Sequence, residues 1–595
     1  MKVKYLIGLL GVIGLVVGHE DHMMDHDYID EQANDSAGVA PMDVATPNTE
    51  NLNSNLPLPS LIPVPHVPKH HHGVPILNTS LLPEERLFWE NFDTTTYFSV
   101  TSSHHLSLYV HIVLGFVAMY FVYPILLIFN NLNLRNLYFG GLAVHTTLMT
   151  ISIVNYFIFI NSIEDLYPGN AYHKMTWILL FTTTIHMVLT VFLGFYRKGE
   201  EYTLVENSSD YDQESLTESL YGYQNHASDS TNATSCESPS CSHTPEFDEN
   251  QLKTSINAML PTLTLKLQGR IERVMSIVFN LLNWGHLVYF LVYIPTGVAT
   301  FLVLGKGNTV FNLLAHFIKG GVFFIYGMLS LARYSGAFTH KGWAWNHRFI
   351  ISSQSSKYLP LGLFTMEFLE SSLILFYGCT NIFLEHLSDA GGEWSPKDLQ
   401  HASIAFIFIG CGLCGVITDI KLNSWRFEKS VENYEAQSKL HNSHKINKGS
   451  PGFSPNPFPV ITIFWTGILM SKHQQDSPLS TEIHIQWGNL LILACAFRFI
   501  TYFLQMTVKP SSKIALTQPT RPFTELVVSF GLLCGGLIFM ESTDSVVLLF
   551  EYYGFTSMLT LNVSLGLITL FMSWEMLLFA FKDWLITKKE NLSTY

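Results

Sequence analysis

The chain has 595 residues, of which 48% are hydrophobic and only 13% are charged, and its formal net charge at pH 7 is −14. A soluble protein carries about a quarter charged residues, so the composition excludes a soluble multidomain enzyme. The negative charge argues against a nucleic-acid partner, because it would repel a phosphate backbone. The seven cysteines are scattered along the chain and outline no disulfide framework.

Residues 1–18 have the organisation of a signal peptide. Lys2 and Lys4 precede a short apolar run, and Gly18 stands before a polar start. The run is short for a membrane span, although an uncleaved signal anchor is the alternative. We therefore expect an integral membrane protein that enters the secretory pathway. The sequence does not distinguish the plasma membrane from the vacuolar membrane or another endomembrane.

Residues 19–103 are polar, acidic and without sustained periodicity, which predicts a disordered extracytoplasmic tail. Its histidine, methionine and aspartate side chains suit copper or zinc, and the thioethers favour Cu(I). The candidate metal ligands of the tail are His19, His22, His26, His70, His71 and His72. The alternative is that these histidines are simply free in solvent. Asn34 and Asn78 begin sequons, which predicts N-glycosylation outside the cytoplasm.

Ten later apolar runs are long enough to cross a bilayer, and a shorter one makes an eleventh predicted span. They lie near 106–130, 137–161, 175–196, 275–304, 308–332, 358–386, 400–420, 458–471 (the short one), 481–506, 522–549 and 556–580. Eleven spans and an extracytoplasmic N-terminus concentrate lysine and arginine on the cytoplasmic side, as the positive-inside rule requires. We therefore predict an all-α polytopic helical bundle in a lipid bilayer, with a cytoplasmic C-terminus.

The predicted organisation places helices 1–3 in residues 104–199 and helices 4–11 in residues 271–595. Between them, residues 200–270 contain an acidic, serine-rich stretch that we expect to be a disordered cytoplasmic loop. A kinase is one candidate partner of this loop, because phosphorylated serines can create docking sites. A cytoplasmic electron donor is another.

Four histidines lie at two depths in the first four spans. His111 and His173 lie near the outer ends of spans one and three, whereas His145 and His286 lie near the inner ends of spans two and four. Each level thus has one imidazole from each of two parallel spans. This arrangement suits two stacked b-type haems, each with two histidine ligands. The alternative is that each histidine faces the bundle interior and only forms a hydrogen bond to a neighbouring helix.

The stretch His111–Gly115, with Val144–His145 and Tyr172–Lys174, resembles the core of the cytochrome b-561 family of transmembrane electron carriers. The resemblance implies haem b as the cofactor and, if the chain is an enzyme, a transmembrane oxidoreductase. Two features depart from the family pattern. The acidic loop interrupts the core, and no basic cluster suited to ascorbate flanks His173.

Charged side chains also lie within the later spans, where they are costly and often functional. The candidate groups of an ion or proton pathway are Glu367, Glu370, Glu541 and Asp544. Glu367 and Glu370 are one helical turn apart, so we expect them to meet the same partner. Lys319 with Glu367 and Arg498 with Glu525 are conceivable ion pairs.

A dense motif occupies Pro457–Gly488 and includes Phe464–Gly467, Met470–Gln475 and His484–Gly488. Together with Arg498 and Thr501–Tyr502, it resembles the C-terminal domain of the fungal Ytp-type transmembrane proteins. This resemblance implies a fungal polytopic membrane protein, without a known reaction. His473 and His484 lie at the outer mouth of the motif and are candidate ligands for Zn²⁺ or Cu²⁺. The alternative is that these are ordinary polar residues at the membrane interface.

Three functions remain open on this basis. The first is transmembrane electron transfer through haems, including a metal reductase that reduces metal collected by the tail. The second is a transporter of transition-metal ions or protons. The third is a structural or trafficking protein of the secretory system. An ATP-driven pump is disfavoured, because no glycine-rich nucleotide-binding loop is apparent.

Overall fold

The computed structural model describes residues 73–208, 249–351, 363–384, 396–437, 446–472, 475, 477–508 and 515–593. Several predictions lie outside these residues and stay predictions. They are the signal peptide, the metal ligands His19, His22, His26, His70, His71 and His72, the sequon at Asn34, and the candidate ligand His473.

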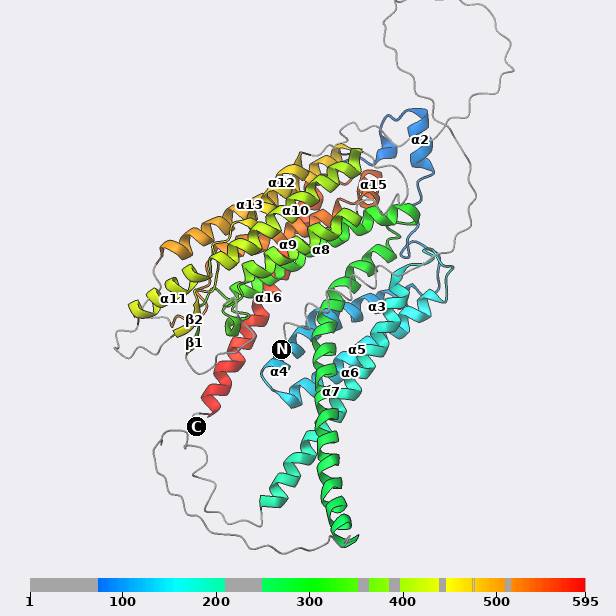
Figure 1. The fold of residues 1–595 in the computed structure, drawn as a ribbon. Helices are drawn as coiled ribbons and strands as arrows, with labels where there is room; N and C mark the ends of the chain where they lie inside the picture. Colours follow the sequence, from blue (N-terminus) through cyan, green and yellow to red (C-terminus); the bar gives the residue numbers. More distant parts are fainter. Residues whose placement is uncertain are drawn as a thin grey trace, which may run out of the picture.

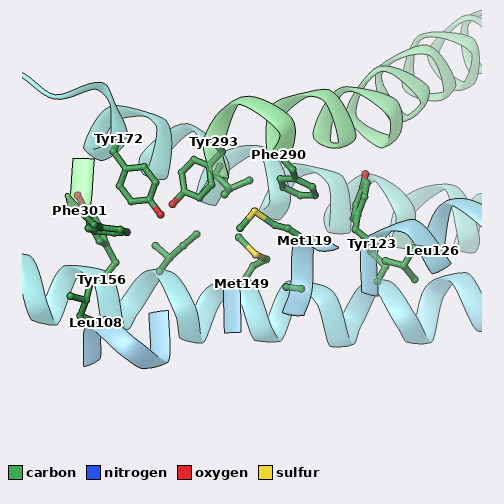
Figure 2. Packing of buried hydrophobic residues seen from close by; sticks show 14 of the residues in the cluster. Leu108, Met119, Tyr123, Leu126, Met149, Tyr156, Tyr172, Phe290, Tyr293 and Phe301 are labelled. Carbon is green, nitrogen blue, oxygen red and sulfur yellow. The ribbon is translucent and has the colours of Figure 1, made fainter. Parts of the chain in front are cut away.

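The first half of the chain forms a four-helix bundle (Figure 1). Its helices are α3 (His105–Phe116), η2 (Val117–Val122) and α4 (Tyr123–Asn131) as one continuous rod, then α5 (Arg135–Ile160), α6 (Ala171–Ser208) and α7 (Glu249–Phe301). The buried faces meet in an apolar core that contains many aromatic rings and two methionines (Figure 2). Large apolar side chains on the outer faces stay exposed, as expected of helices that face lipid.

One segment of the first rod, η2, is a π-helix rather than an α-helix. Pro124 follows it at the start of α4 and has no backbone N–H to donate to the carbonyl of Tyr120 four residues earlier. The Tyr123 N–H instead donates to the Ala118 carbonyl, five residues back. Pro124 therefore leaves the Tyr120 carbonyl without its usual backbone donor, and a side chain can use it.

The second half of the chain forms a larger bundle (Figure 1). Its long helices are α8 (Val310–Tyr334), α9 (Met366–Leu384), α10 (Pro396–Lys421), α12 (Phe458–Ser471), α13 (Pro478–Thr507), α14 (Thr524–Glu541) and α16 (Ser557–Ser593). Two further helices, α11 (Asn423–Gln437) and α15 (Asp544–Tyr553), lie at opposite ends of this bundle. Helices α8 and α14 approach closely at Gly320 and Gly536, where a Cβ on either glycine would lie 2.6 Å from the carbonyl oxygen of the other.

The predicted helical membrane fold is confirmed. Among the described residues, nine helices are long and apolar enough to cross a membrane, and α9 and α12 occupy the other two predicted spans. The end of the predicted span 522–549 is wrong, because α14 ends at Glu541 and α15 begins at Asp544. The run Glu541–Asp544 is polar, and an aspartate in the first turn favours the start of a new helix.

Two short strands were not predicted. β1 (Arg348–Ile351) pairs antiparallel with β2 (Ile446–Ser450), with Arg348 opposite Ser450. The strands are four and five residues long, too short to give a clear alternating pattern in the sequence. They join two interhelical connections that are far apart in the chain, and they lie beside α11 at one end of the second bundle (Figure 1).

The predicted disorder of residues 19–103 is wrong for its last part. The described residues from Gly73 onward include η1 (Ile76–Asn78) and α2 (Pro83–Glu90), and the side chains of Ile76, Trp89 and Tyr97 are buried. Trp89 packs against Tyr552 of α15, and the Tyr97 N–H donates to the Phe301 carbonyl at 3.1 Å. A few widely spaced apolar side chains pack this polar segment against the bundles. Their spacing is not periodic, so the sequence pattern does not reveal them.

The predicted disordered loop 200–270 is likewise helical at both ends. Helix α6 continues to Ser208, and α7 begins at Glu249. Residues 209–248 lie outside the described part of the chain. The acidic composition did not reveal these helix ends, because charged residues are compatible with a helix once it leaves the apolar layer.

Candidate functional site

The first predicted haem pair, His111 with His173, does not form. His111 is buried, and its two ring nitrogens lie 3.0 Å from the Ser152 carbonyl and 2.8 Å from the Tyr172 hydroxyl. His173 is exposed and accepts a hydrogen bond from Trp177 of its own helix at 3.3 Å. The ring of Tyr156 packs against both histidines, with centroid distances of 5.1 and 6.0 Å. His111 is thus a satisfied core histidine.

The second predicted pair, His145 with His286, belongs to a larger group. Both side chains are buried in the first bundle, together with His186 of α6. The ring centroids of His186 and His286 are 5.3 Å apart, and the ring of Tyr123 packs against both His145 and His286, at 4.9 and 5.9 Å. We call His145, His186 and His286 the histidine cluster. Its third member matches neither predicted haem level in the sequence, and only the packing of α5, α6 and α7 brings it in.

The arrangement of these side chains does not fit two stacked haems. The outer level lacks two facing imidazoles, as described above. At the inner level, the rings of Tyr123 and Phe290 each pack against both His145 and His286, at centroid distances between 4.9 and 6.0 Å. A porphyrin would have to displace these rings, so we derive no step through haem.

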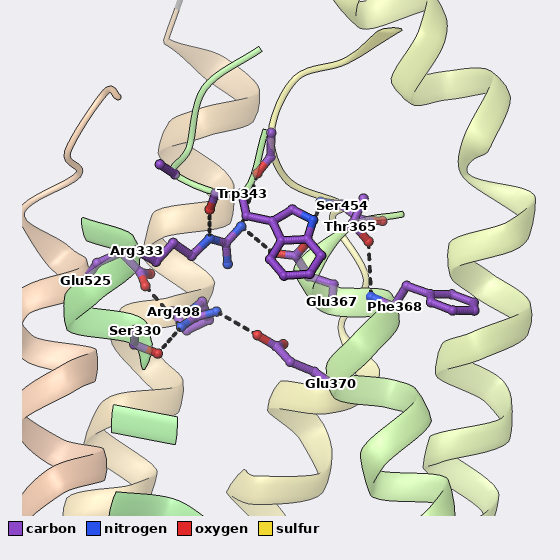
Figure 3. A network of polar contacts seen from close by, with 12 residues as sticks. Ser330, Arg333, Trp343, Thr365, Glu367, Phe368, Glu370, Ser454, Arg498 and Glu525 are labelled. Carbon is purple, nitrogen blue, oxygen red and sulfur yellow. Dashed lines mark hydrogen bonds and ion pairs between the residues drawn. The ribbon is translucent and has the colours of Figure 1, made fainter. Parts of the chain in front are cut away.

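A second polar group lies in the second bundle, at the end that carries the two strands (Figure 3). Arg333, near the end of α8, pairs with Glu367 at 2.9 Å and also donates to the carbonyls of Trp343 and Gly452. Its guanidinium lies 3.8 Å from the ring centroid of Trp345, a cation–π contact. Trp345 has a left-handed backbone (φ 54°), a strained conformation that the surrounding contacts must hold in place.

Arg498 of α13 is the second cation of this group. It lies 3.0 Å from Glu525 of α14, 3.7 Å from Glu370 of α9 and 3.2 Å from the Ser330 hydroxyl (Figure 3). The conceivable pair of Arg498 with Glu525 therefore occurs, whereas Glu367 pairs with Arg333 and not with Lys319. Glu367 and Glu370 share a helix face as predicted, but their shortest ion pairs are to different arginines.

A third ion pair joins the group through the backbone of the β2–α12 connection. Arg426 of α11 lies 3.1 Å from Asp419 and donates to the Ser454 hydroxyl at 3.2 Å. The Ser454 N–H in turn donates to Glu367 at 3.0 Å. We call the whole group the ion cluster. Its buried charged members are Glu367, Glu370, Asp419, Glu525, Arg333, Arg426 and Arg498.

The other predicted site residues lie apart from both clusters. Glu541 accepts a hydrogen bond from Ser564 at 2.6 Å, and Asp544 is exposed at the start of α15. His484 Nδ1 lies 2.8 Å from the Ser480 carbonyl, and Asn78 is exposed in η1. Within the described residues, no three histidine, cysteine or carboxylate side chains have the spacing of a formed metal site.

Comparison with known proteins assigns the chain to a family. Residues 289–583 match the family described as "Protein YTP1-like, C-terminal", and residues 91–196 match "Domain of unknown function (DUF2427)". "Uncharacterized membrane protein YCR061W" of Saccharomyces cerevisiae is 41% identical, over 90% of this chain and 92% of its own. The chain belongs to the YTP1-like membrane protein family. This confirms the resemblance based on the Pro457–Gly488 motif.

Two further relatives match shorter parts of the YTP1-like chain. "Uncharacterized membrane protein C3B8.06" of Schizosaccharomyces pombe is 38% identical over 50% of this chain and 58% of its own. "Protein YTP1" of Saccharomyces cerevisiae is 24% identical over 40% of this chain and 39% of its own. No solved structure matches significantly. These names support a polytopic membrane protein, and the cytochrome b-561 resemblance stays a prediction.

Proposed function

We propose that this YTP1-like protein is a proton-coupled transporter whose proton-binding group is Glu370. The observation that carries the proposal is the composition of the ion cluster, which buries four carboxyl groups and three guanidinium groups. Burying an unbalanced charge within a membrane protein is expensive, and the group neutralises instead. One carboxyl group of the cluster therefore takes a proton or a cation.

Glu370 is the carboxyl group best placed to be that one. Its distance to Arg498 is 3.7 Å, whereas the other three carboxylates lie 2.9 to 3.1 Å from an arginine. Both of its oxygens are buried without a well-formed hydrogen bond, although the Tyr326 hydroxyl lies beside it. Arg498 holds Glu525 more closely, so protonation of Glu370 leaves balanced pairs.

The surroundings of Glu370 suit a group that exchanges protons. A cavity of about 10 Å³, room for one water molecule, is lined by Tyr326, Cys495 and Arg498 among other residues. Next to the cluster, the connections containing Trp343–Trp345 and Gly452–Ser454 supply non-helical backbone. Such backbone at membrane depth is tolerated where protein buries it or where it lines a cavity, as at transporter binding sites.

The protonation of Glu370 is tested by infrared spectroscopy of the purified full-length protein. A buried protonated carboxyl group has a carbonyl stretch that carboxylates lack and that shifts in D₂O. We expect this band at neutral pH in the native protein and its loss in Glu370→Gln. The surface variant Asp583→Asn should keep the band. An unchanged band in Glu370→Gln would refute the assignment.

Coupling is tested in liposomes that contain a pH-sensitive dye. With an imposed pH gradient, we expect proton flux with the native protein and with Asp583→Asn. Glu370→Gln should reduce the flux at least tenfold while the protein remains folded. Proton flux that is equal in Glu370→Gln would contradict the proposal. Complete absence of flux with the native protein would instead favour a structural or trafficking role.

A further inference from the structure

The histidine cluster differs from the other buried histidine of the same bundle in its hydrogen bonds. His145 Nδ1 lies 3.2 Å from the carbonyl oxygen of Ala118 in the π-helix η2. A carbonyl oxygen can only accept, so Nδ1 carries the proton and Nε2 carries a lone pair. His145 Nε2 is buried and has no hydrogen-bond partner.

The hydrogen bonds of His186 lead to the same result. The Tyr138 hydroxyl donates its proton to the Asn283 side-chain oxygen at 2.9 Å. The hydroxyl oxygen therefore accepts from His186 Nε2–H, which lies 2.9 Å away. The remaining nitrogen, His186 Nδ1, carries a lone pair and is buried without a partner.

His286 completes the set. The Thr182 hydroxyl donates to the Ile178 carbonyl at 2.8 Å, so its oxygen accepts from His286 Nε2–H at 3.0 Å. His286 Nδ1 is then the third buried lone pair without a partner. His111, by contrast, has partners for both nitrogens. Three neighbouring imidazoles thus each satisfy their N–H and leave a nitrogen lone pair uncovered.

We propose that His145, His186 and His286 bind one Cu(I) ion. Metal-ligating histidines commonly donate their other N–H to a carbonyl, carboxylate or other acceptor, which is the pattern at all three rings. The cluster contains no carboxylate, so a monovalent ion costs less to bury there than a divalent one. Met149 lies one turn beyond His145, and Met119 and Met149 belong to the same buried core (Figure 2). Thioethers also favour Cu(I).

Copper binding at this site requires local movement. The three rings do not yet have the spacing of a formed metal site within the described residues, and the Tyr123 ring packs against His145 and His286. The imidazoles must move toward a common point as the ion enters, and Tyr123 must move aside. The inference does not depend on the proposed transport, because the ion cluster lies in the other bundle.

The test is anaerobic Cu(I) titration of the purified full-length protein against a coloured Cu(I) chelator. Because the N-terminal histidines can also bind copper, the measured quantity is the difference between variants that share the same tail. We expect His186→Gln and His286→Gln to bind one Cu(I) fewer than the native protein. His111→Gln should bind the native number, and gel filtration should show that all variants are folded.

Three results would overturn the assignment. One is an unchanged Cu(I) stoichiometry in folded His186→Gln and His286→Gln. Another is loss of one equivalent of Zn²⁺, rather than Cu(I), in these variants. The third is a Soret band in the isolated native protein that disappears in His286→Gln, which would assign the lone pairs to haem. X-ray absorption of the copper-loaded protein should show nitrogen ligands in the native protein and fewer in His186→Gln.

Discussion

At the residue scale, the role of a side chain depends on which partners surround it. His111 and His186 are both buried histidines of one bundle, yet the first has two hydrogen-bond partners and the second has one. Glu525 and Glu370 both face Arg498, yet only Glu525 lies at the distance of a close ion pair. Residue type and burial are alike in each comparison, so the difference is visible only in the contacts.

Arg498 gives a direct prediction about stability. Replacing it in Arg498→Met leaves Glu525 buried without its cation, and removing one partner of a buried pair costs about 3–5 kcal/mol. We expect the free energy of unfolding, measured by denaturant titration in detergent, to fall by that amount. The double variant Arg498→Met/Glu525→Gln should recover part of the loss. A double variant as unstable as the single one would show that the pairing itself is not responsible.

His347, in the connection before β1 and outside the spans, predicts a pH dependence. Burial, with a smaller effect of the positive charge of Lys429, lowers the pKa of His347 to about 4. Its Nε2 accepts a hydrogen bond from Asn433 at 2.9 Å, which only the neutral ring can do. An unfolded histidine has a pKa of about 6.5, so the unfolded state binds more protons below that pH.

The stability contribution of His347 is therefore complete above about pH 6.5 and decreases as the pH falls toward 4. The loss should reach about 3 kcal/mol at pH 4, from the two pKa values. Denaturant titrations of the native protein and His347→Gln at several pH values measure it as a difference. Because glutamine can accept from Asn433 without titrating, the variant should lose less stability on acidification. Equal slopes in the two proteins would rule the mechanism out.

At the element scale, the π-helix η2 connects the two bundles. Its Ala118 carbonyl accepts from His145 in the first bundle, and its Tyr120 carbonyl accepts from Trp574 Nε1 of α16 at 3.0 Å. Pro124 explains why the second carbonyl is free, since it has no N–H to offer. One irregular turn therefore orients a ligand candidate and also anchors the last helix of the chain.

The contact with α16 can be tested by Trp574→Phe. Phenylalanine retains ring packing against Phe121, 5.0 Å away, but cannot donate to the Tyr120 carbonyl. We expect a loss of about 1 kcal/mol in the free energy of unfolding in detergent, the usual net value of one hydrogen bond. Trp584→Phe, at an exposed position of the same helix, is the matched control and should change little. Equal stability of the two variants would contradict the role of this bond.

At the scale of the whole molecule, the two bundles carry different chemistry. The first encloses imidazoles in an aromatic core, and the second encloses paired charges near a small sheet. The two family matches divide near this boundary, since 91–196 covers the first three spans and 289–583 extends from within the fourth span, the last helix of the first bundle, into α16. The proposed copper site and the proposed proton site lie in separate bundles and can be changed independently, which keeps the two proposals separable by experiment.

The sequence by itself determined the membrane class, the positions of nearly all spans and the family, because apolar runs and a dense motif are local features of the chain. It also singled out Glu370, Arg498, His145 and His286 as costly residues at membrane depth. Only the tertiary structure decided that Arg333 pairs with Glu367, that His186 joins the cluster and that residues 73–103 pack on the bundles. The reason is physical: hydropathy records how deep a residue lies, whereas its partners depend on how each helix rotates and packs against its neighbours.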